Sequence, residues 1–276
     1  MIGIMDVNGS MNAVSTAGQL HLADGEFPIQ PLAWLGAWPA ELALREQAEW
    51  RFIDGQRCLI FPLDIPLLRL QFPRGSFAGL VWAPIRTTIV LGAAGQPTRD
   101  VFLEQAVNDG LLLVQRRGGG GTVLLAPGML CCSFAADVRD PFGNRRYFRE
   151  INQAMIAGFA AAGVSELQQS GLSDLAARGR KIAGSSIYRS RQRLIYHSVA
   201  LVNPDLELIS RYLAHPPREP DYRAGRTHRD FLAALVPRQP NASPRSLAAG
   251  MASAVTDGLR RMLLDDWTPA DRNTVA

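Results

Sequence analysis

The sequence almost lacks lysine. Lys181 is its only lysine, so 28 of its 29 Lys and Arg residues are arginine. The two cations differ, because guanidinium is a planar fork whereas an ammonium is a compact point charge that can face a single carboxylate or phosphate oxygen. A single lysine can survive by chance, or position 181 can require an ammonium. The neighbouring Gly179, Ala183 and Gly184 favour the second interpretation, because small residues let a ligand approach closely.

Cysteine is also scarce, and Cys58, Cys131 and Cys132 are the three in the chain. Three cysteines provide neither a disulfide framework nor the spacing of metal ligands. Cys131 and Cys132 would point to opposite faces of a strand, because side chains alternate along it. We therefore expect buried thiols in a reducing compartment.

Long apolar runs are absent, and none approaches the roughly 20 residues that a membrane span needs. The first 26 residues contain no Lys or Arg, so the basic start of a signal peptide is missing. These observations predict a cytoplasmic protein with no membrane partner. The net charge of +4 fits an acidic protein partner, whereas the dispersed arginines, without interleaved aromatic residues, argue against nucleic acid.

The spacing of apolar residues predicts five helices and a series of short strands. The helices are expected at 39–53, 101–108, 148–162, 205–213 and 243–264. The strands are expected at 57–61, 67–72, 79–83, 87–91, 111–115, 122–125, 131–135, 181–188 and 193–201. We expect 122–125 to pair with 131–135 across the turn at Pro127 and Gly128, and 181–188 to pair with 193–201. The prolines in 215–229 predict a long surface loop.

Strands and helices follow one another without βα regularity. This order predicts an α+β fold with a mixed, largely antiparallel sheet flanked by helices. The first 28 residues lack a periodic pattern and predict a loosely ordered arm. We expect one domain over 29–240, followed by a helix and tail over 241–276 with no separate accessory domain.

Arg116 and Arg117 follow an apolar strand and precede four consecutive glycines at 118–121. Such a run lets backbone N–H groups converge on an anion, and the two guanidinium forks suit phosphate or carboxylate. The run is neither a P-loop nor the GxGxxG motif of dinucleotide-binding proteins. The alternative is a flexible hinge between two strands, which would not need the arginines.

Other motifs accompany this run in a fixed order. They are ELALRE at 41–46, TIVLGAAGQP at 88–97, RRGGGGTV at 116–123, SDL at 173–175, GRKIAGSS at 179–186 and HSVALV at 197–202. Together they resemble the catalytic domain of the lipoate-protein ligase, octanoyltransferase and biotin ligase superfamily, on the lipoate-ligase side. The resemblance covers roughly residues 36–235. It implies a fold like that of class II aminoacyl-tRNA synthetases and biotin ligases, with 29–240 as the catalytic domain.

The resemblance implies a lipoate-protein ligase that uses ATP and Mg²⁺ to convert lipoate or octanoate to an acyl-adenylate. A lysine of an acidic acceptor, a lipoyl domain or an H-protein-like partner, then displaces AMP. Lys181 matches the catalytic lysine, and Arg117 or Arg116 would meet the phosphate. The other implied substrate- and nucleotide-binding residues are Gly119, Gly120, Gly121, Thr122, Val123, Leu124, Asp174, Ala183, Gly184, Ser185 and His197. His197 has a second interpretation as a structural residue at a strand end, and no metal ligand is implied.

Octanoyltransferases of this superfamily carry the acyl chain on a cysteine. The two positions where they place it correspond to 213–217 and 168–173 here, and neither holds a cysteine. The alternatives to a ligase are therefore a transferase that uses Cys131 or Cys132, a non-catalytic lipoyl- or nucleotide-binding protein, and a biotin ligase. Within 218–229, Arg223, Arg226 and Arg229 are expected to cover the adenylate and steer the acidic partner, unless the segment is only a solvated connection.

Overall fold

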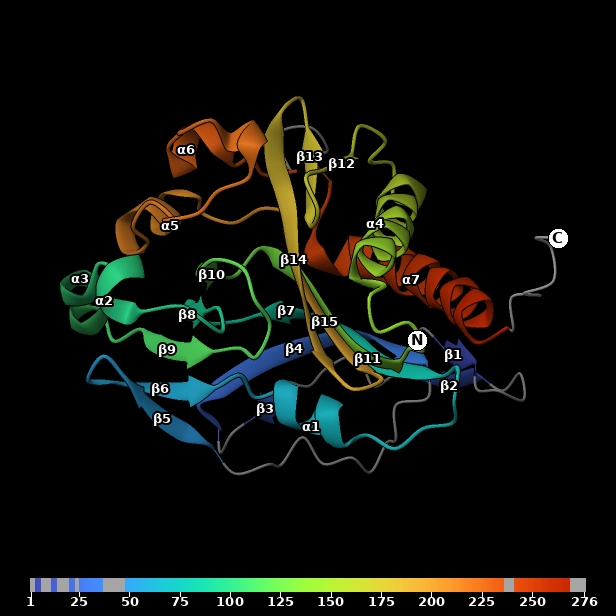
Figure 1. Cartoon of the computed structure of the whole chain (residues 1–276). Coiled ribbons are helices and arrows are strands. Elements are labelled where there is room, and N and C mark those ends of the chain that lie inside the picture. The colour runs from blue at the N-terminus through green and yellow to red at the C-terminus, as the bar shows by residue number, and fades with distance from the viewer. Residues whose placement is uncertain are drawn as a thin grey trace, which may run out of the picture.

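The computed structural model describes residues 3–5, 11–13, 20–22, 25–36, 48–235 and 241–268. Its centre is an eight-stranded sheet in which every pairing is antiparallel (Figure 1). Across the sheet the strands are β12 (Gln168–Ser170), β13 (Asp174–Ala177), β14 (Arg180–Ser190), β15 (Arg193–Leu201), β11 (Met129–Asp137), β7 (Phe77–Pro84), β4 (Phe27–Gly36) and β3 (Leu20–Leu22). The predicted α+β fold class and the pairing of 181–188 with 193–201 are both confirmed.

A second sheet of five strands mixes the two directions. In order it contains β10 (Val123–Leu125), β8 (Thr88–Leu91), β9 (Leu112–Gln115), β6 (Gln56–Ile60) and β5 (Trp50–Ile53). Strands β8 and β6 run parallel to β9, and the other pairings are antiparallel. A separate antiparallel pair, β1 (Gly3–Met5) and β2 (Met11–Ala13), lies within the first 28 residues. That this segment is a loosely ordered arm stays a prediction.

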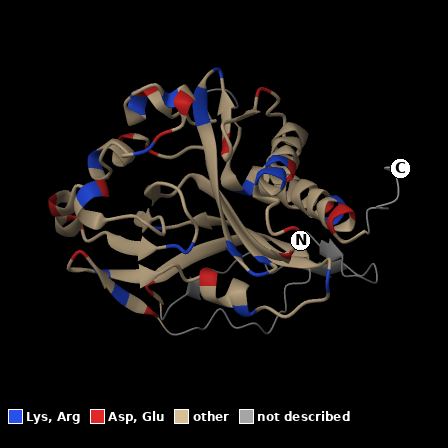
Figure 2. Ribbon diagram, in the orientation of Figure 1, with Lys and Arg blue, Asp and Glu red and all other residues tan. Residues whose placement is uncertain are grey.

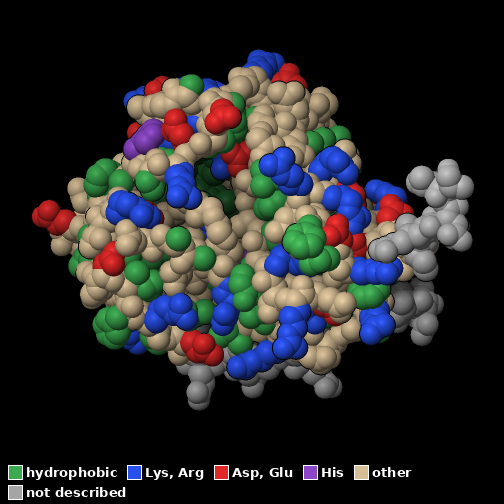
Figure 3. All heavy atoms as spheres, in the orientation of Figure 1, with side chains coloured by type: hydrophobic (Ala, Val, Ile, Leu, Met, Phe, Trp, Pro, Cys, Tyr) green, Lys and Arg blue, Asp and Glu red, His purple; other side chains and the backbone are tan. Residues whose placement is uncertain are grey.

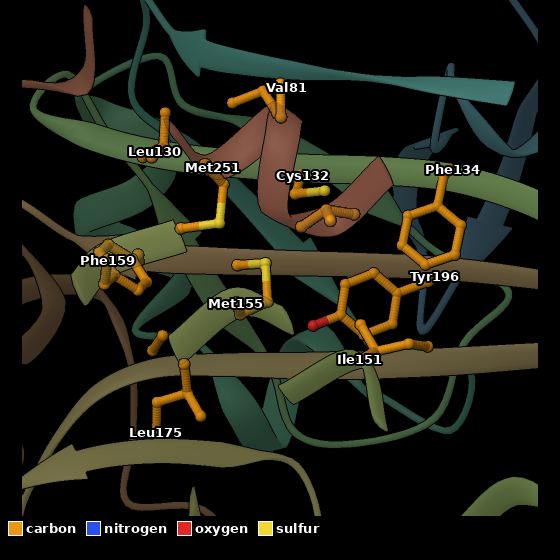
Figure 4. Packing of buried hydrophobic residues seen from close by; sticks show 14 of the residues in the cluster. Val81, Leu130, Cys132, Phe134, Ile151, Met155, Phe159, Leu175, Tyr196 and Met251 are labelled. Carbon is orange, nitrogen blue, oxygen red and sulfur yellow. The ribbon is translucent and has the colours of Figure 1, made fainter. Parts of the chain in front are cut away.

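Two long helices, α4 (Asn144–Ala161) and α7 (Pro244–Trp267), pack on one face of the large sheet (Figure 1). Helix α4 buries Ile151, Met155 and Phe159 at spacings of three to four residues, the period of an amphipathic helix. Figure 4 shows these side chains beside Met251 of α7 and Cys132 of β11. This contact layer forms the main hydrophobic core.

Helix α7 has a well-defined start. The Ser243 side chain accepts from the backbone N–H of Ser246, and the Ser246 side chain accepts from Ser243 N–H, which is a capping box. Farther along, α7 crosses α4 closely, because a Cβ at Gly158 would lie only 2.9 Å from the Cα of Met251. The small residue in α4 therefore sets the distance between the helices.

Short helices occupy the connections. They are α1 (Asp64–Arg69), α2 (Pro97–Asp100), α3 (Leu103–Asn108), α5 (Glu207–Tyr212), α6 (His228–Phe231) and the 3-10 turn η2 (Asp221–Arg223). None of the helices within the described ranges is both long and apolar enough to cross a membrane. Figure 2 shows positive and negative residues spread over these outer elements, while the central strands of the large sheet carry few.

Several sequence predictions were wrong. Residues 50–53 of the predicted helix 39–53 form β5, and residues 37–47 lie outside the described part. The predicted strand at 67–72 does not form: 67–69 are the end of helix α1 and 70–72 are irregular. Pro66 favours the helix because its fixed φ suits a first helical turn. The predicted pairing of 122–125 with 131–135 does not form, because β10 pairs with β8 whereas β11 lies between β15 and β7. The predicted surface loop at 215–229 contains η2 and the start of α6.

The two adjacent cysteines of β11 face opposite ways, as predicted. Cys131 belongs to the core that includes Trp82, whereas Cys132 belongs to the core beneath α4 and α7. Both are 1% exposed. Strand β11 therefore separates the helix-covered face of the sheet from the face that bears the candidate site.

Candidate active site

A cavity of about 900 Å³ lies between the glycine run, strands β14 and β15, and the segment 213–232. Figure 3 shows the surface hollowed between the α5 and α6 region and β14. The predicted site residues that line it are Arg116, Gly120, Gly121, Thr122, Val123, Leu124, Asp174, Lys181, Ala183, Gly184, Ser185 and His197. Arg117 and Gly119 are the members of the predicted set that lie off its wall.

The cavity has an apolar inner end and a polar outer end. Phe61, Trp82 and Leu125 line the inner end and are at most 5% exposed. At the outer end, the side chains of Lys181 and Arg99 are 27% and 44% exposed. A ligand with an apolar tail and an anionic head would match this gradient.

Lys181 is held by a carboxylate inside the cavity. Its Nζ lies 2.9 Å from Oδ1 of Asp174, and the Tyr222 hydroxyl donates to Oδ2 of Asp174 over 3.0 Å. Burial, together with the Asp174 charge, raises the pKa of Tyr222, so this hydroxyl remains a donor at neutral pH. A Cβ at Gly184 would lie 2.6 Å from Nζ, so only glycine at this position lets the lysine lie along β14.

Arg116 is part of the wall rather than a free cation. Its Nη2 donates to the carbonyls of Gly119 and Gly121, each at 2.8 Å, and its Nη1 donates to the carbonyl of Val90. Burial lowers the pKa of Arg116 to about 10, against the opposing effect of the Asp64 charge, so the guanidinium is still charged at neutral pH. The side chain thus fixes the shape of the glycine run.

Arg117 points elsewhere. Its guanidinium carbon lies 6.0 Å from the centre of the Tyr188 ring, and its backbone N–H donates to Oδ2 of Asp64 over 2.7 Å. The sequence did not decide which of the two arginines would face the ligand. In the structure, Arg116 lines the cavity and Arg117 does not.

Asp100 organises the rim next to the glycine run, although sequence reasoning did not select it. Its carboxylate accepts from the Thr122 hydroxyl over 2.9 Å, from the Gln96 backbone N–H and from the Arg99 guanidinium. Burial alone would raise the pKa of Asp100, but the hydrogen bonds from Arg99, Thr122 and Gln96 outweigh it and lower that pKa. A charged carboxylate therefore holds Thr122 in place.

A chain of buried polar groups crosses the inner end of the cavity. Trp82 Nε1–H donates to Ser133 Oγ over 3.0 Å, and Ser133 Oγ lies 2.8 Å from His197 Nδ1. His197 Nε2 lies 2.8 Å from Oδ1 of Asp64, which is fully buried at the start of α1. Sequence reasoning found His197 and missed the other three. A lone acid within the apolar stretch 58–68 was the available signal for Asp64.

The segment 215–229 is bound to the protein instead of standing free in solvent. Arg223 is buried, lies 3.3 Å from the Glu219 carboxylate and donates to the carbonyl of Arg226. Arg226 donates to the carbonyls of Gly179 and Tyr222. Of the three predicted arginines, Arg223 and Arg226 fasten the segment, and Arg229 is exposed. The predicted solvated loop is therefore a structured cap over the Lys181 end of the cavity.

Cys131 lines the cavity, yet its thiol is poorly suited to carry an acyl group. Burial, with the neighbouring Cys132, raises the pKa of Cys131 well above its usual range. Burial raises the pKa of Cys132 to about 12. Since the thiolate is the nucleophile, both cysteines are inert at neutral pH.

A known family model matches more than half of the chain. The sequence model of the lipoyl protein ligase A/B catalytic domain matches residues 79–235 of this chain. That span includes the glycine run, Asp174, Lys181 and His197, and it excludes Asp64.

Solved structures with a similar fold include the following three. A structure of a bipartite lipoate protein ligase and its E2 lipoyl domain from Thermoplasma acidophilum is 20% identical, with a TM-score of 0.54 over 65% of this chain and 76% of that one. Ta0514 of T. acidophilum, a putative lipoate protein ligase with bound lipoic acid, is 19% identical, with a TM-score of 0.51 over 65% and 78%. LipL1 of Plasmodium falciparum in complex with lipoate is 19% identical, with a TM-score of 0.53 over 66% and 49%. These likenesses support the fold.

Proposed function

The chain belongs to the lipoyl protein ligase A/B catalytic domain family, and from this premise we propose that it activates lipoate or octanoate with ATP and transfers the acyl group to a lysine of an acceptor protein. As a member of this family it is an enzyme of the lipoate ligase type. The finer proposal rests on the position of Lys181. Its ammonium pairs with the Asp174 carboxylate inside a cavity that has an apolar inner end.

In the first half-reaction, a carboxylate oxygen of the acid would attack the α-phosphorus of ATP and release pyrophosphate. Lys181 would face the oxygens on which negative charge accumulates, and its ammonium can follow that charge without reorganising. Asp174 and Tyr222 keep the side chain in position for this task. The glycine run offers close backbone approach to the phosphates beside it.

The acyl chain would extend into the inner end of the cavity. Phe61, Trp82, Val90 and Leu125 line that end, and apolar burial there would supply binding energy. The volume of about 900 Å³ lies within the roughly 300–1,000 Å³ of typical small-molecule sites. It has room for an eight-carbon acid together with a nucleotide at the wider outer end.

Mg²⁺ is implied for the ATP-dependent step. Within the part of the chain that the structure describes, no group of three or more His, Cys, Asp or Glu side chains is arranged to hold a metal ion. Three aspartates line the cavity, and two of them, Asp100 and Asp174, already bind Arg99 and Lys181. Asp221 is the third. Because Mg²⁺ at nucleotide sites is usually held by one or two carboxylates together with substrate phosphates, the described residues offer no site made of protein ligands alone, and we derive no step through the metal.

In the second half-reaction, the ε-amine of the acceptor lysine would attack the acyl carbonyl and displace AMP. We propose an acidic lipoyl domain or H-protein-like acceptor, because this chain has a net charge of +4 and one structure with its fold includes an E2 lipoyl domain. Arg218 lines the outer end of the cavity and is exposed, so it is available to such a partner. We further propose that 29–240 is the catalytic domain and that the protein acts in the cytoplasm.

A cysteine-dependent transferase is the second candidate, and Cys131 is its only thiol on the described cavity wall. The raised pKa of Cys131 argues against it.

The direct test incubates the protein with a recombinant lipoyl domain, lipoate and ATP, and measures the mass of the domain. We expect a lipoyl adduct that requires ATP. An adduct formed only from an acyl thioester, without ATP, would instead support the transferase.

A further inference from the structure

The inner end of the cavity holds four polar side chains in one series, Trp82, Ser133, His197 and Asp64. None is more than 8% exposed, and Asp64 is fully buried. Buried polar groups need an explanation, because each one left without a partner is costly. The proposed function gives Trp82, Ser133 and Asp64 no chemical role, and Asp64 lies outside the residues that the family model matches.

With Asp64 as a carboxylate and His197 as a neutral imidazole, the contacts of this series allow one arrangement of protons. The Trp82 indole can only donate, so Ser133 Oγ accepts from it. An ionised Asp64 can only accept, so His197 Nε2 must carry a proton toward it. With a neutral imidazole, Nδ1 then accepts the Ser133 hydroxyl proton. This is the arrangement in which every donor in the series has an acceptor.

Asp64 also uses its second oxygen. Oδ2 accepts from the backbone N–H of Arg117 over 2.7 Å, at the entry to the glycine run, and the charge of Arg116 lies close by. A neutral side chain at position 64 could not accept from both His197 and Arg117 in the same way. Asp64 therefore determines which nitrogen of His197 carries the proton, and it also positions the backbone at the entry to the glycine run.

The consequence lies on the cavity wall. Because each hydrogen-bonding proton of the series is used within it, these four side chains offer no free donor to a ligand. The neighbouring lining residues Phe61, Val90 and Leu125 are apolar. A ligand tail that carries a hydroxyl group would lose its water there and gain no partner, which costs affinity.

We propose that Asp64 is a positioning residue that makes the cavity select acids whose far end lacks hydrogen-bonding groups. It does so by fixing the proton of His197 on Nε2, which keeps the Ser133 hydroxyl directed at His197 and away from the ligand. This selectivity rests on the proposed activation of an acyl acid. The proton position itself does not.

Asp64→Asn is the informative variant, because asparagine keeps the size and changes the protons. If its amide donates to His197 Nε2, the imidazole proton moves to Nδ1 and donates to Ser133 Oγ. The Ser133 hydroxyl proton then turns toward the cavity and can bind a hydroxyl on the ligand. Ser133→Ala breaks the series at another point, because it removes the partner of both the Trp82 N–H and His197 Nδ1.

The experiment measures acid-dependent ATP/pyrophosphate exchange with octanoate and 8-hydroxyoctanoate. We expect the wild type to prefer octanoate, and Asp64→Asn to reduce the ratio of the two kcat/KM values about tenfold with little change in KM for ATP. Ser133→Ala should also reduce the ratio, because it leaves the Trp82 N–H and His197 Nδ1 free to bind a hydroxyl on the ligand. The control is Asp266→Asn, a buried carboxylate at the junction of α4 and α7, which should lower stability and leave the ratio unchanged.

A folded Asp64→Asn enzyme with the wild-type ratio would overturn the proposal. If Asp64→Asn does not fold, a measurement on the wild-type protein still tests the proposal. Long-range ¹H–¹⁵N NMR correlations of the imidazole rings, assigned with His197→Gln among the four histidines, report the tautomer of His197. A proton on Nε2 at neutral pH supports the proposal, and a proton on Nδ1 contradicts it. Absence of exchange with every acid would refute the ligase activity while leaving this NMR result intact.

Discussion

The ammonium of Lys181 lies 2.9 Å from the carboxylate of Asp174, and the Tyr222 hydroxyl holds the other oxygen of that carboxylate. This pair joins the start of β14 to the start of β13 and places the one lysine of the chain on the cavity wall. The lack of a side chain at Gly184 leaves room for the lysine, because an added Cβ there would lie 2.6 Å from Nζ.

Lys181→Arg should therefore lose activity while the protein remains folded. The guanidinium keeps the charge, but its planar fork cannot occupy the space of the ammonium beside Gly184. We expect kcat for adenylate formation to fall at least about 100-fold, the usual cost of losing one transition-state donor. Steady-state kinetics and a thermal melt measure the two effects. Arg229→Lys, on an exposed side chain, is the matched control and should retain full activity.

Gly184→Ala should reduce activity without changing any charge. The added Cβ would lie 2.6 Å from Lys181 Nζ and 2.7 Å from Cε, so the lysine must leave its position. We expect a loss of kcat comparable to that of Lys181→Arg, with a small change in melting temperature. Gly250→Ala in α7 should be fully active, because its added Cβ would come no closer than 3.4 Å to another atom, the carbonyl oxygen of Gly158 in α4. Equal activity of both alanine variants would refute this steric role of Gly184.

The thiols should resist alkylation in the folded protein. Burial, with the Asp54 charge, raises the pKa of Cys58 to about 11, and burial raises that of Cys132 to about 12. A thiolate forms only as pH rises toward the pKa, so at pH 8 its fraction is about 0.1% or less. Iodoacetamide labelling followed by mass spectrometry should be slow until urea unfolds the chain.

Cys131→Ala should likewise retain ATP-dependent acyl transfer, because no thioester is needed. The substitution should cost some stability, since the buried thiol packs as a small apolar group. Loss of transfer in a folded Cys131→Ala enzyme, with an acyl adduct on the wild-type cysteine, would favour the transferase.

The cap over Lys181 should depend on its buried arginine. Arg223→Ala removes a side chain that is 5% exposed and leaves the Glu219 carboxylate without that partner. We expect a clear loss of stability, because the variant also loses the contact with the Phe231 ring and the hydrogen bond to the Arg226 carbonyl. Arg229→Ala, whose side chain is 79% exposed, should change stability by less than about 0.5 kcal/mol. Urea denaturation of the two variants compares them directly, and equal midpoints would show that Arg223 does not fasten the cap.

Local sequence patterns were sufficient to predict the features that depend on residues close together in the sequence. The hairpin of β14 and β15, the glycine run and Lys181 each depend on contiguous residues, and all were predicted. Helix α1 was not, because its apolar run is too short to distinguish a helical from a strand period. The pairing partner of β10 was also missed, since the turn at Pro127 and Gly128 carries the chain from one sheet to the other.

The polar series of the inner wall could not be predicted for a different reason. Ser133 and His197 are 64 positions apart, and His197 and Asp64 are 133 apart. The register of β11 against β15 brings Ser133 opposite His197, and nothing in the local sequence specifies that register. The contacts of Arg223 and Arg226 could not be predicted either, because a run of arginines and prolines does not reveal that their donors meet carbonyls of the same segment.

The most direct measurement is lipoate-dependent exchange of labelled pyrophosphate into ATP by the purified wild type and by Lys181→Arg. If the acyl-adenylate forms at this cavity, the wild type should catalyse exchange only when the acid is present. A folded Lys181→Arg enzyme should show an exchange rate at least about 100-fold lower. Exchange that persists in Lys181→Arg would contradict the assigned role of the lysine. No exchange by the wild type with lipoate or octanoate, in a preparation that still transfers an acyl group from a thioester, would contradict the ligase itself.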